Sequence, residues 1–339
     1  MKPSVRLVAE RAKVSHATVS RVLNNVDVRI APETRLRVER IASEMGYQPN
    51  RNARALATGR TQSVALWATN LRSVYYGEYI HFIHEETLRH DYDLMVSGAK
   101  VPQYGVVGKD VTLDTSKLMS WPVDGIIAVD LPRATVPGMK GSLLGGIPFI
   151  NVGGYVLESA DYVQVDFTEP AIEAVQHLAT VGCRRIAYLV PDWFEWFIPS
   201  DDPRLSGYKS VMAALGQEPE FIVSPNERRE GVASVLAAYI EQHGCPDGIF
   251  CYNDEMAIGA FLELRKLGRR IPEDVALVGC DGIRESEYLH PPLTTIMPPL
   301  EEMCSVAWSF LMKRIQDPTL PLQAARLKAR LEVRGSSQR

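Results

Sequence analysis

The stretch HATVSRVLNN, residues 16–25, combines polar and aliphatic residues at a helical spacing near the start of the chain. Four small or hydrogen-bonding residues fall at positions i, i+3, i+4 and i+7 and so share one face of a helix: Ala17, Ser20, Arg21 and Asn24. The opposite face carries aliphatic residues: Val19, Val22 and Leu23. Such a helix buries its aliphatic face and presents the polar face, with His16 beside it, to a narrow partner surface.

The flanking segments predict two more short helices that position this one. The helix before it has an apolar stripe and Ser4 as its N-cap: Val5, Val8, Ala9 and Ala12. The helix after it begins near Pro32, ends at Gly46 and has a similar stripe: Val38, Ile41, Ala42 and Met45. Because only the residues KVS separate the first two helices, the pattern predicts a helix-turn-helix. A small helical bundle without a ligand remains the alternative.

Charge is distributed unevenly along the chain. Residues 1–60 contain twelve Lys and Arg against five Asp and Glu, a net charge of +7, whereas the whole chain has a net charge of −4. The remaining residues therefore carry −11. A basic head on an acidic body indicates that only the head meets a polyanion. A solvated basic surface is the alternative, but it does not explain why the basic segment coincides with the predicted helix-turn-helix.

Composition favours an ordinary globular protein of two or three domains, with 339 residues, 46% hydrophobic and 23% charged. No apolar run approaches the roughly 20 residues of a membrane span, and the N-terminus lacks the apolar region of a secretion signal. The five cysteines are odd in number and form no C-x-x-C pair, which is typical of thiols in a reducing cytosol. We therefore expect a cytoplasmic protein that does not interact with membranes.

From residue 62 onward, short β-rich runs alternate with amphipathic segments. The expected strands are SVALWAT, YDLMVSG, DGIIAVD, IPFINVG, YVQVD, RRIAYLV, DGIFCY and DVALVGCD. The expected helices cover residues 77–90, 169–181, 204–215, 231–243 and 254–267. This alternation predicts an α/β fold of parallel sheets with helices on both faces. Gly153 and Gly154 mark a break, which favours two similar lobes with a ligand cleft at the carboxyl ends of their strands.

Motifs for catalysis are missing from this sequence. It contains no G-x-S-x-G, no Walker loop and no dinucleotide-binding G-x-G-x-x-G. His81 and His84 stand three residues apart on an expected helix, where surface positions are a simpler explanation than a metal site. The cluster WFEWF, residues 193–197, fits loop packing, or stacking on a sugar or base ring at the mouth of a cleft. We expect no enzyme, no metal and no cofactor.

Five motifs together resemble the lac repressor/purine repressor family of bacterial transcription regulators. They are TVSRVLN (18–24), GYQPNRNARALATGRT (46–61), CYNDEMAIGA (251–260), RRIPEDVALVGCDG (269–282) and PPLTTI (291–296). The resemblance implies an N-terminal helix-turn-helix headpiece, a hinge helix and a two-lobed core like that of periplasmic sugar-binding proteins. It also implies a homodimer that binds a pseudo-palindromic operator in double-stranded DNA. The implied boundaries are 1–49 for the headpiece, 50–60 for the hinge, 61–161 with 296–320 for the first lobe, and 162–290 with 321–339 for the second.

The resemblance also implies which residues contact DNA. Three are expected to meet base edges in the major groove: His16, Ala17 and Arg21. Others are expected to contact phosphates: Ser4, Ser15, Thr18, Ser20 and Asn24. Within the hinge the expected contacts are Asn50, Ala53, Arg54, Leu56 and Ala57, with the leucine wedged into a central base step of the minor groove. One departure is Lys13, which stands where the family usually has glycine in the turn.

Effector-binding residues follow from the resemblance in the same way. A guanidinium, an amide and a carboxylate are expected to clamp the hydroxyls of a ligand: Arg204, Asn253 and Asp281. Asp281 has the alternative of capping the segment that follows it. Further expected contacts are Tyr75, Tyr76, Asp166 and Trp196. A sugar is the first choice of effector and a nucleobase the second.

Three classes of function fit parts of this pattern. A solute-binding protein with a similar core needs a signal peptide and no basic head, and a sugar-modifying enzyme needs a nucleophile or paired carboxylates in its cleft. The basic head and Leu56 favour the third class. We therefore predict a sequence-specific transcriptional regulator, most simply a repressor, whose operator affinity is controlled by the effector.

Overall fold

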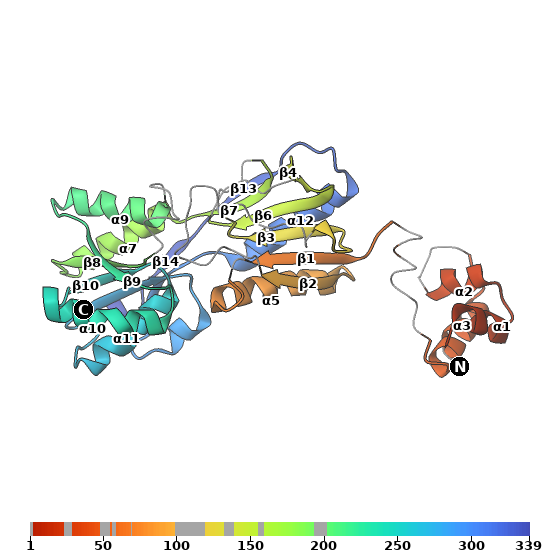
Figure 1. Ribbon diagram of the computed structural model, residues 1–339, viewed down its shortest axis with the longest axis horizontal. Helices are drawn as coiled ribbons and strands as arrows, with labels where there is room; N and C mark the ends of the chain where they lie inside the picture. The colour runs from red at the N-terminus through yellow and green to blue at the C-terminus, as the bar shows by residue number, and fades with distance from the viewer. Residues whose placement is uncertain are drawn as a thin grey trace. The chain divides into compact units, whose positions relative to one another are not determined.

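A computed structural model of the chain describes residues 3–23, 29–47, 55, 59–68, 70–98, 119–131, 139–154, 159–192 and 202–339 (Figure 1). The chain divides into two compact units. The smaller unit is Met1–Ser63 with Pro122–Asp124, and the larger is Val64–Trp121 with Gly125–Arg339.

Among the described residues of the smaller unit, three helices pack together: α1 (Val5–Ala12), α2 (His16–Leu23) and α3 (Pro32–Glu44). Their apolar faces meet in one buried core: Val8, Ala9, Ala12, Val19, Val22, Val38 and Ala42. All of these lie on the stripes that the residue spacing predicted. The helix-turn-helix prediction is therefore confirmed at the level of individual core residues.

Local hydrogen bonds fix the ends of these helices. The Ser4 hydroxyl accepts the backbone N–H of Leu7 at 3.3 Å, as expected of an N-cap, and the Ser15 hydroxyl accepts that of Thr18 at 3.1 Å. Lys13 ends α1 in the left-handed conformation, with φ 54° and ψ 45°. Because glycine adopts this conformation without steric cost, the backbone geometry explains why the family usually has glycine there.

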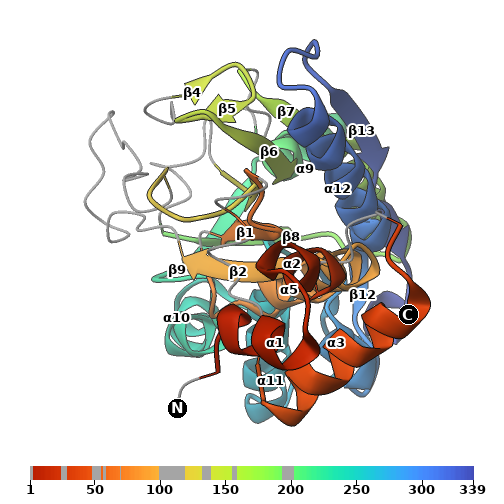
Figure 2. The same ribbon diagram turned by 90° about the vertical axis from the view of Figure 1, so that its right-hand side faces the viewer.

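The first sheet of the larger unit has the strand order β13-β7-β6-β3-β1-β2, with the short hairpin β4–β5 joined to β6. Its strands are β1 (Ser63–Ala68), β2 (Asp93–Gly98), β3 (Gly125–Val129), β4 (Met139–Lys140), β5 (Leu143–Leu144), β6 (Ile147–Gly153), β7 (Asp161–Asp166) and β13 (Ala324–Lys328). Helix α12 (Leu300–Gln316) packs against β3, β6 and β7 and against α5 (Val74–Arg89) (Figure 2). The central strands β1 and β3 are almost entirely apolar and buried, as is typical of a parallel sheet covered on both faces.

The second sheet has the order β14-β12-β11-β10-β8-β9. Its strands are β8 (Ile186–Pro191), β9 (Glu220–Ser224), β10 (Gly248–Cys251), β11 (Ala276–Cys280), β12 (Thr294–Met297) and β14 (Arg330–Glu332). The accompanying helices are α7 (Thr168–Thr180), α9 (Pro203–Ala214), α10 (Arg229–His243), α11 (Asp254–Lys266) and the 3-10 turns η1 (Arg284–Tyr288) and η2 (Gly335–Ser337). Only β14 runs antiparallel to its neighbour among the paired strands of this sheet that the structure describes. The predicted two-lobed α/β architecture is confirmed.

Strand pairing corrects the lobe boundaries predicted from the sequence. Residues 162–166 and 324–328 were assigned to the second lobe, but β7 and β13 pair in parallel within the first sheet. Residues 296–297 were assigned to the first lobe, but they belong to β12 of the second sheet. The chain therefore crosses between the lobes after β7, after β12 and after β13. Gly153 and Gly154 mark the end of β6 and not the boundary of a lobe.

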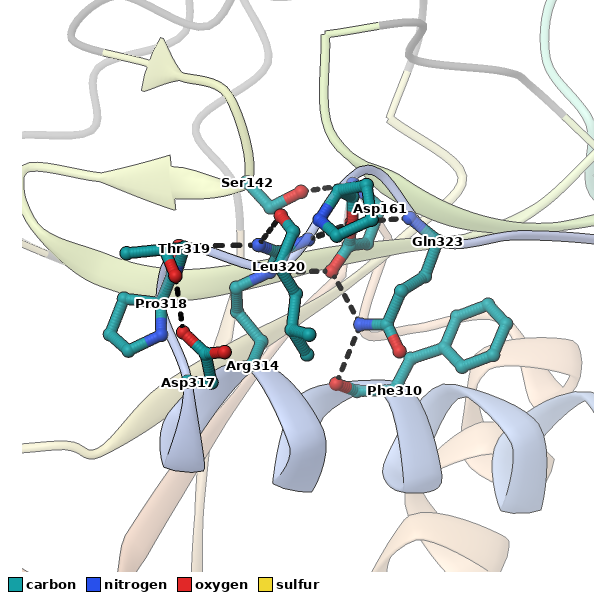
Figure 3. Close-up of polar contacts among 10 residues, drawn as sticks. Ser142, Asp161, Phe310, Arg314, Asp317, Pro318, Thr319, Leu320 and Gln323 are labelled. Carbon is teal, nitrogen blue, oxygen red and sulfur yellow. Dashed lines mark hydrogen bonds and ion pairs between the residues drawn. The ribbon is translucent and has the colours of Figure 1, made fainter.

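A buried ion pair holds the connection between α12 and β13 in place (Figure 3). The Arg314 guanidinium donates to both carboxylate oxygens of Asp161, at 2.8 and 3.0 Å, and to the carbonyls of Pro318, Leu320 and Pro321. Burial alone would raise the pKa of Asp161, but hydrogen bonds from Arg314 and Gln323 hold it below its usual value. This network joins the end of α12 and the start of β13 to the first residue of β7.

Candidate DNA-binding and effector-binding sites

Helix α2 presents its polar face to solvent. The residues predicted to meet base edges are all exposed: His16, Ala17 and Arg21. The residues predicted to contact phosphates are exposed or half-buried: Ser4, Ser15, Thr18 and Ser20. Ser4 and Ser15 also cap helices, so the chain fixes their hydroxyls at the helix N-termini. The other predicted DNA contacts lie outside the described residues and stay predictions: Asn24, Asn50, Ala53, Arg54, Leu56 and Ala57.

Asp124 clamps the segment that follows the predicted hinge. Its Oδ1 accepts the backbone N–H and the hydroxyl of Thr61 at 2.7 and 2.9 Å, and its Oδ2 accepts the N–H of Gln62 at 3.0 Å. The backbone N–H of Asp124 also donates to the carbonyl of Ser63 at 2.8 Å. Asp124 directly precedes β3, so a residue that the sequence analysis did not single out joins the segment after the predicted hinge to a central strand.

The residues predicted to bind the effector follow the carboxyl ends of strands in both lobes. Tyr75 and Tyr76 begin α5 after β1, Arg204 begins α9 after β8, and Asn253 and Asp281 follow β10 and β11. In open α/β sheets this edge is where ligands bind. The fold thus collects side chains that lie up to about 200 residues apart in the chain.

Arg204 is buried, with 8% of its surface exposed, and is held from several sides. Its Nη2 donates to Asp202 Oδ2 at 3.0 Å and to the Tyr252 hydroxyl at 2.8 Å. The guanidinium carbon lies 3.9 Å from the centre of the Tyr252 ring and 5.5 Å from that of Phe167. Such stacking and pairing fix the plane of the guanidinium before any ligand arrives.

Asp281 is also buried, with 9% of its surface exposed, and its backbone φ is 121°. Among the described residues, no donor lies within hydrogen-bonding distance of its carboxylate, so it does not cap the following segment. Burial raises its pKa well above the usual range, and the nearby charge of Asp254 raises it further. A buried carboxyl group without a donor of its own is suited to accept hydrogen bonds from a ligand.

Asn253 has structural partners that the sequence did not reveal. Its Oδ1 accepts the N–H of Met256 at 2.8 Å, which makes Asn253 the N-cap of α11. Its Nδ2 donates to the carbonyl of Glu227 at 3.5 Å. The protein therefore orients the side-chain amide, and a ligand that binds it would share it with the N–H of Met256 or the carbonyl of Glu227.

Asp130 is a candidate contact that the sequence analysis missed. It directly follows β3, and its Oδ1 accepts the N–H of Gly154 at 2.7 Å. Burial raises the pKa of Asp130 to about 6, although the hydrogen bond from Gly154 and the charge of Arg204 oppose that rise. A Cβ atom at Gly153 would lie 2.0 Å from Asp130 Oδ1, so the conformation requires glycine there. In the sequence, a carboxylate directly after the apolar run GIIAV could have identified Asp130 as a candidate contact.

Tyr75 is almost completely buried beside this carboxylate. Its hydroxyl lies 3.1 Å from that of Tyr79, and its ring meets the ring of Tyr76 edge to face at 5.5 Å. Burial, followed by the charge of Asp130, raises the pKa of Tyr75 well above its usual value. Tyr75 therefore stays protonated beside Asp130.

Two further contacts hold the cleft. Asn70, which follows β1, donates from Nδ2 to Glu227 Oε1 at 2.7 Å, and Glu227 follows β9, so this bond joins the two lobes. Asp254 accepts the Thr295 hydroxyl at 2.6 Å and the N–H of Ile283 at 2.9 Å, which fixes the turn after Asp281. Burial raises the pKa of Asp254 to about 7.

For two of the residues predicted to bind the effector, the structure describes no interaction with the other predicted effector residues. Asp166 is exposed, and its Oδ1 accepts the N–H of Thr168 at 2.8 Å at the start of α7. In the described part of the chain, its carboxylate contacts no other predicted effector residue. Trp196 lies outside the described residues.

His81 and His84 are exposed on α5, and no group of three His, Cys, Asp or Glu side chains in the described part of the chain is placed to hold a metal ion. No described helix is both long and apolar enough to cross a membrane.

Fold and site together define a DNA-binding regulator with a ligand-binding core. Residues 5–50 match the family model described as bacterial regulatory proteins, lacI family, and residues 175–337 match a periplasmic binding protein-like domain. The chain is 33% identical over 347 residues to the HTH-type transcriptional regulator CelR of Thermobifida fusca, covering 99% of this chain and 98% of that protein. The chain belongs to the lacI family, as its motifs predicted.

Other relatives agree with this assignment. Catabolite control protein A of Priestia megaterium is 27% identical over 345 residues, with 100% of both chains covered. The solved CelR–cellobiose complex has a TM-score of 0.66 at 27% identity and covers 98% of this chain and 99% of that one. The lac repressor dimer bound to operator shares the fold, with a TM-score of 0.81 at 21% identity and 99% coverage of each chain. The sequence relatives named here are transcriptional regulators and not enzymes.

Proposed function

We propose that this protein is a transcriptional repressor whose affinity for its operator is controlled by a sugar bound between the lobes. The observation that carries the effector proposal is the pair formed by Arg204 and Asp281. The first is a buried, preoriented donor, and the second is a buried acceptor that no donor among the described residues satisfies. Together they offer one donor group and one acceptor group to vicinal hydroxyls.

Relatives support a sugar as the effector. CelR has been solved with cellobiose, and a lacI family regulator from Enterococcus faecium, 24% identical in sequence, has been solved with ribose. Tyr75, Tyr76 and Asn253 supply the aromatic and amide groups that commonly accompany sugar recognition. A nucleobase remains the second choice.

For DNA binding, we propose that α2 lies in the major groove, with Arg21 contacting a guanine and Ala17 a thymine methyl group. His16 meets a third base edge, and the capping hydroxyls of Ser4 and Ser15 donate to phosphates. Leu56 enters the minor groove from the hinge. Two copies of the chain then read a pseudo-palindromic operator as a homodimer in the bacterial cytoplasm, where such DNA is located.

The coupling follows from the lobe contacts. The bond between Asn70 and Glu227 links the lobes beside the effector cleft. A sugar that binds one relative position of the lobes better than another shifts their population by its difference in affinity. Linkage then requires operator DNA to change sugar affinity by the same factor.

The test uses an operator selected from random DNA with the full-length chain, followed by a thermal-shift and calorimetric screen of cellobiose, ribose and nucleosides. A sugar at 100 times its Kd is expected to stabilise the protein by about 2.7 kcal/mol. Asp281→Asn should lose this stabilisation and still bind the operator. The matched control is Asp91→Asn, an exposed aspartate at φ 56° outside the cleft. An unchanged sugar response in Asp281→Asn refutes the assignment of the site.

A further inference from the structure

Lys13 is a lysine at a backbone position that favours glycine. It lies in the turn between α1 and α2, with φ 54° and ψ 45°. Of the other described non-glycine residues with positive φ, Gln62 is held by a hydrogen bond from its N–H to Asp124, and the rest are aspartates, a type that adopts positive φ more readily: Asp91, Asp130 and Asp281. The end of α1 requires the left-handed conformation of the turn, but it does not require a lysine there.

The side chain of this lysine has no structural partner in the described part of the chain. It is exposed, and its ammonium group takes part in no described hydrogen bond or ion pair. Glu10, the acidic residue nearest before it in α1, pairs with Arg6 at 3.0 Å instead. The carbonyl end of α1 has another cation, because Arg37 donates from Nε to the carbonyl of Ala12 at 3.1 Å. The fold of the headpiece therefore does not use the charge of Lys13.

The turn lies beside residues that are predicted to contact DNA. Lys13 precedes Ser15 by two residues, which span at most about 7 Å. The Ser15 hydroxyl caps α2 by accepting the N–H of Thr18. In a helix-turn-helix the first helix crosses the DNA backbone, and the first residues of the second helix contact base edges, so the turn between them runs next to phosphates. A lysine in this turn carries a point charge on a flexible stem, which suits it to bind a phosphate.

We propose that Lys13 binds a phosphate of the DNA backbone, and that this contact is what the chain gains from a lysine in place of an unstrained glycine. Strained backbone positions of this kind cluster at functional sites. The inference rests on the proposed DNA binding by α2 and adds one residue to that interface. Because a phosphate carries no sequence information, the contact strengthens binding to the operator and to random DNA by the same factor.

The salt dependence of DNA binding measures this contact. Each phosphate contact adds about 0.9 to the slope of log affinity against log salt concentration, so Lys13→Gln should lower the slope by about 0.9 per headpiece and about 1.8 for the proposed dimer. Between about 50 and 200 mM KCl, the wild type should then lose roughly tenfold more affinity than the variant. Fluorescence anisotropy with the full-length chain gives these slopes on an operator selected from random DNA and on a scrambled duplex.

Three further variants separate the charge of the lysine from its effect on the backbone. Lys13→Arg keeps the charge and should keep the wild-type slope. Lys13→Gly relieves the left-handed backbone, so it should raise the thermal stability of the headpiece and yet lower the slope as Lys13→Gln does. The matched control is Lys209→Gln, which removes an exposed lysine charge from α9 in the larger unit and should leave the slope unchanged. A purely structural role would instead make DNA affinity follow stability.

The outcomes separate this inference from the proposed function. A wild-type slope in either Lys13→Gln or Lys13→Gly, with preference for the operator intact, overturns the phosphate contact and leaves the DNA-binding function standing. A loss confined to the operator, with unchanged binding to the scrambled duplex, also overturns it, because Lys13 would then contact a base. If the wild type prefers no selected duplex over the scrambled one, the proposed operator binding and this inference fail together.

Discussion

Removing the carboxylate of Asp124 should uncouple effector binding from DNA binding, and Asp247 provides an internal control. Each aspartate precedes a glycine and a central strand, in the sequences DGII and DGIF. Asp124 accepts three hydrogen bonds from residues 61 and 62, just before β1, at 2.7–3.0 Å. Asp247 makes three contacts with the N–H groups of Arg184 and Arg185, just before β8, at 2.8–3.0 Å. In both lobes, an aspartate before a central strand accepts hydrogen bonds from the residues that precede a neighbouring strand. Only in the first lobe do those residues follow the predicted hinge.

The expected loss of stability is similar for Asp124→Ala and Asp247→Ala. Hydrogen bonds to a charged group contribute roughly 1.5–3 kcal/mol each, but they are not additive, and half-exposed donors regain bonds to water. We therefore expect each variant to lose about 2–4 kcal/mol in the free energy of unfolding of the core. Urea denaturation measures this loss.

The readout that distinguishes the variants is the coupling between ligands. Operator affinity is measured with and without saturating sugar, and the ratio gives the coupling factor. Asp124→Ala should bring this factor close to one while sugar affinity in the absence of DNA stays within about twofold of wild type. Asp247→Ala should keep the wild-type factor. Hydrogen exchange of the Thr61 and Gln62 amides should accelerate by roughly 30-fold in Asp124→Ala alone, the equivalent of about 2 kcal/mol.

Equal coupling factors in the two variants would refute this reasoning. Such a result, with equal losses of stability, would mean that the clamp at residues 61–62 contributes to folding and not to communication. Unchanged exchange of the two amides in Asp124→Ala would contradict the hydrogen-bond geometry itself.

Four further predictions concern single sites. Arg21→Ala should weaken operator binding by about 1–3 kcal/mol and relax one position in each half-site, as measured by gel shifts on a single-base operator library. Lys13→Gly should stabilise the headpiece by roughly 1 kcal/mol, because it relieves a left-handed backbone, and should slow hydrogen exchange of the α1 amides. Arg314→Met should cost about 3–5 kcal/mol in urea denaturation, because it leaves the buried carboxylate partner without its cation. Asp254 has its pKa raised from 3.8 to about 7 by burial, so its contribution to stability is greatest at low pH and falls as the pH rises through this range. Asp254→Asn should therefore reduce the loss of stability between pH 5 and pH 8, as followed by urea midpoints.

The headpiece could be predicted from the sequence residue by residue, because its structure depends on local spacing. The apolar stripes of α1, α2 and α3 and the cap at Ser4 are all read within one or two helical turns. Lobe boundaries depend instead on pairing between distant segments. Strands β7 and β13 pair in the register Ala324↔Tyr162 to Lys328↔Asp166, and no local pattern specifies a partner so far along the chain.

Only part of the effector site could be predicted, because it too depends on contacts between distant segments of the chain. Arg204, Asn253 and Asp281 were identified by resemblance, and the structure places all three at the carboxyl edge of the second sheet. Asp130 was missed because its importance depends on the proximity of Tyr75, in α5, and of Gly154, directly after β6. Asp166 matched the pattern of a polar residue at a strand end, but its carboxylate is occupied by the start of α7. A strand-end carboxylate is therefore informative only when its neighbours in the sheet are known.

Strand β3 has the Asp124 clamp at its amino end and Asp130, a candidate effector contact, at its carboxyl end. Its five residues are buried and pair in parallel with β1 and β6, so β3 can shift only together with its neighbours. Asp124 at its amino end holds residues 61–62, and Asp130 at its carboxyl end faces the proposed effector. Strand β10 occupies the same position in the second lobe, but its preceding aspartate holds the connection to β8 and not the DNA-binding segment. We therefore expect a ligand that draws the two sheet edges together to influence DNA binding through the first lobe, and the comparison of Asp124 with Asp247 also tests that asymmetry.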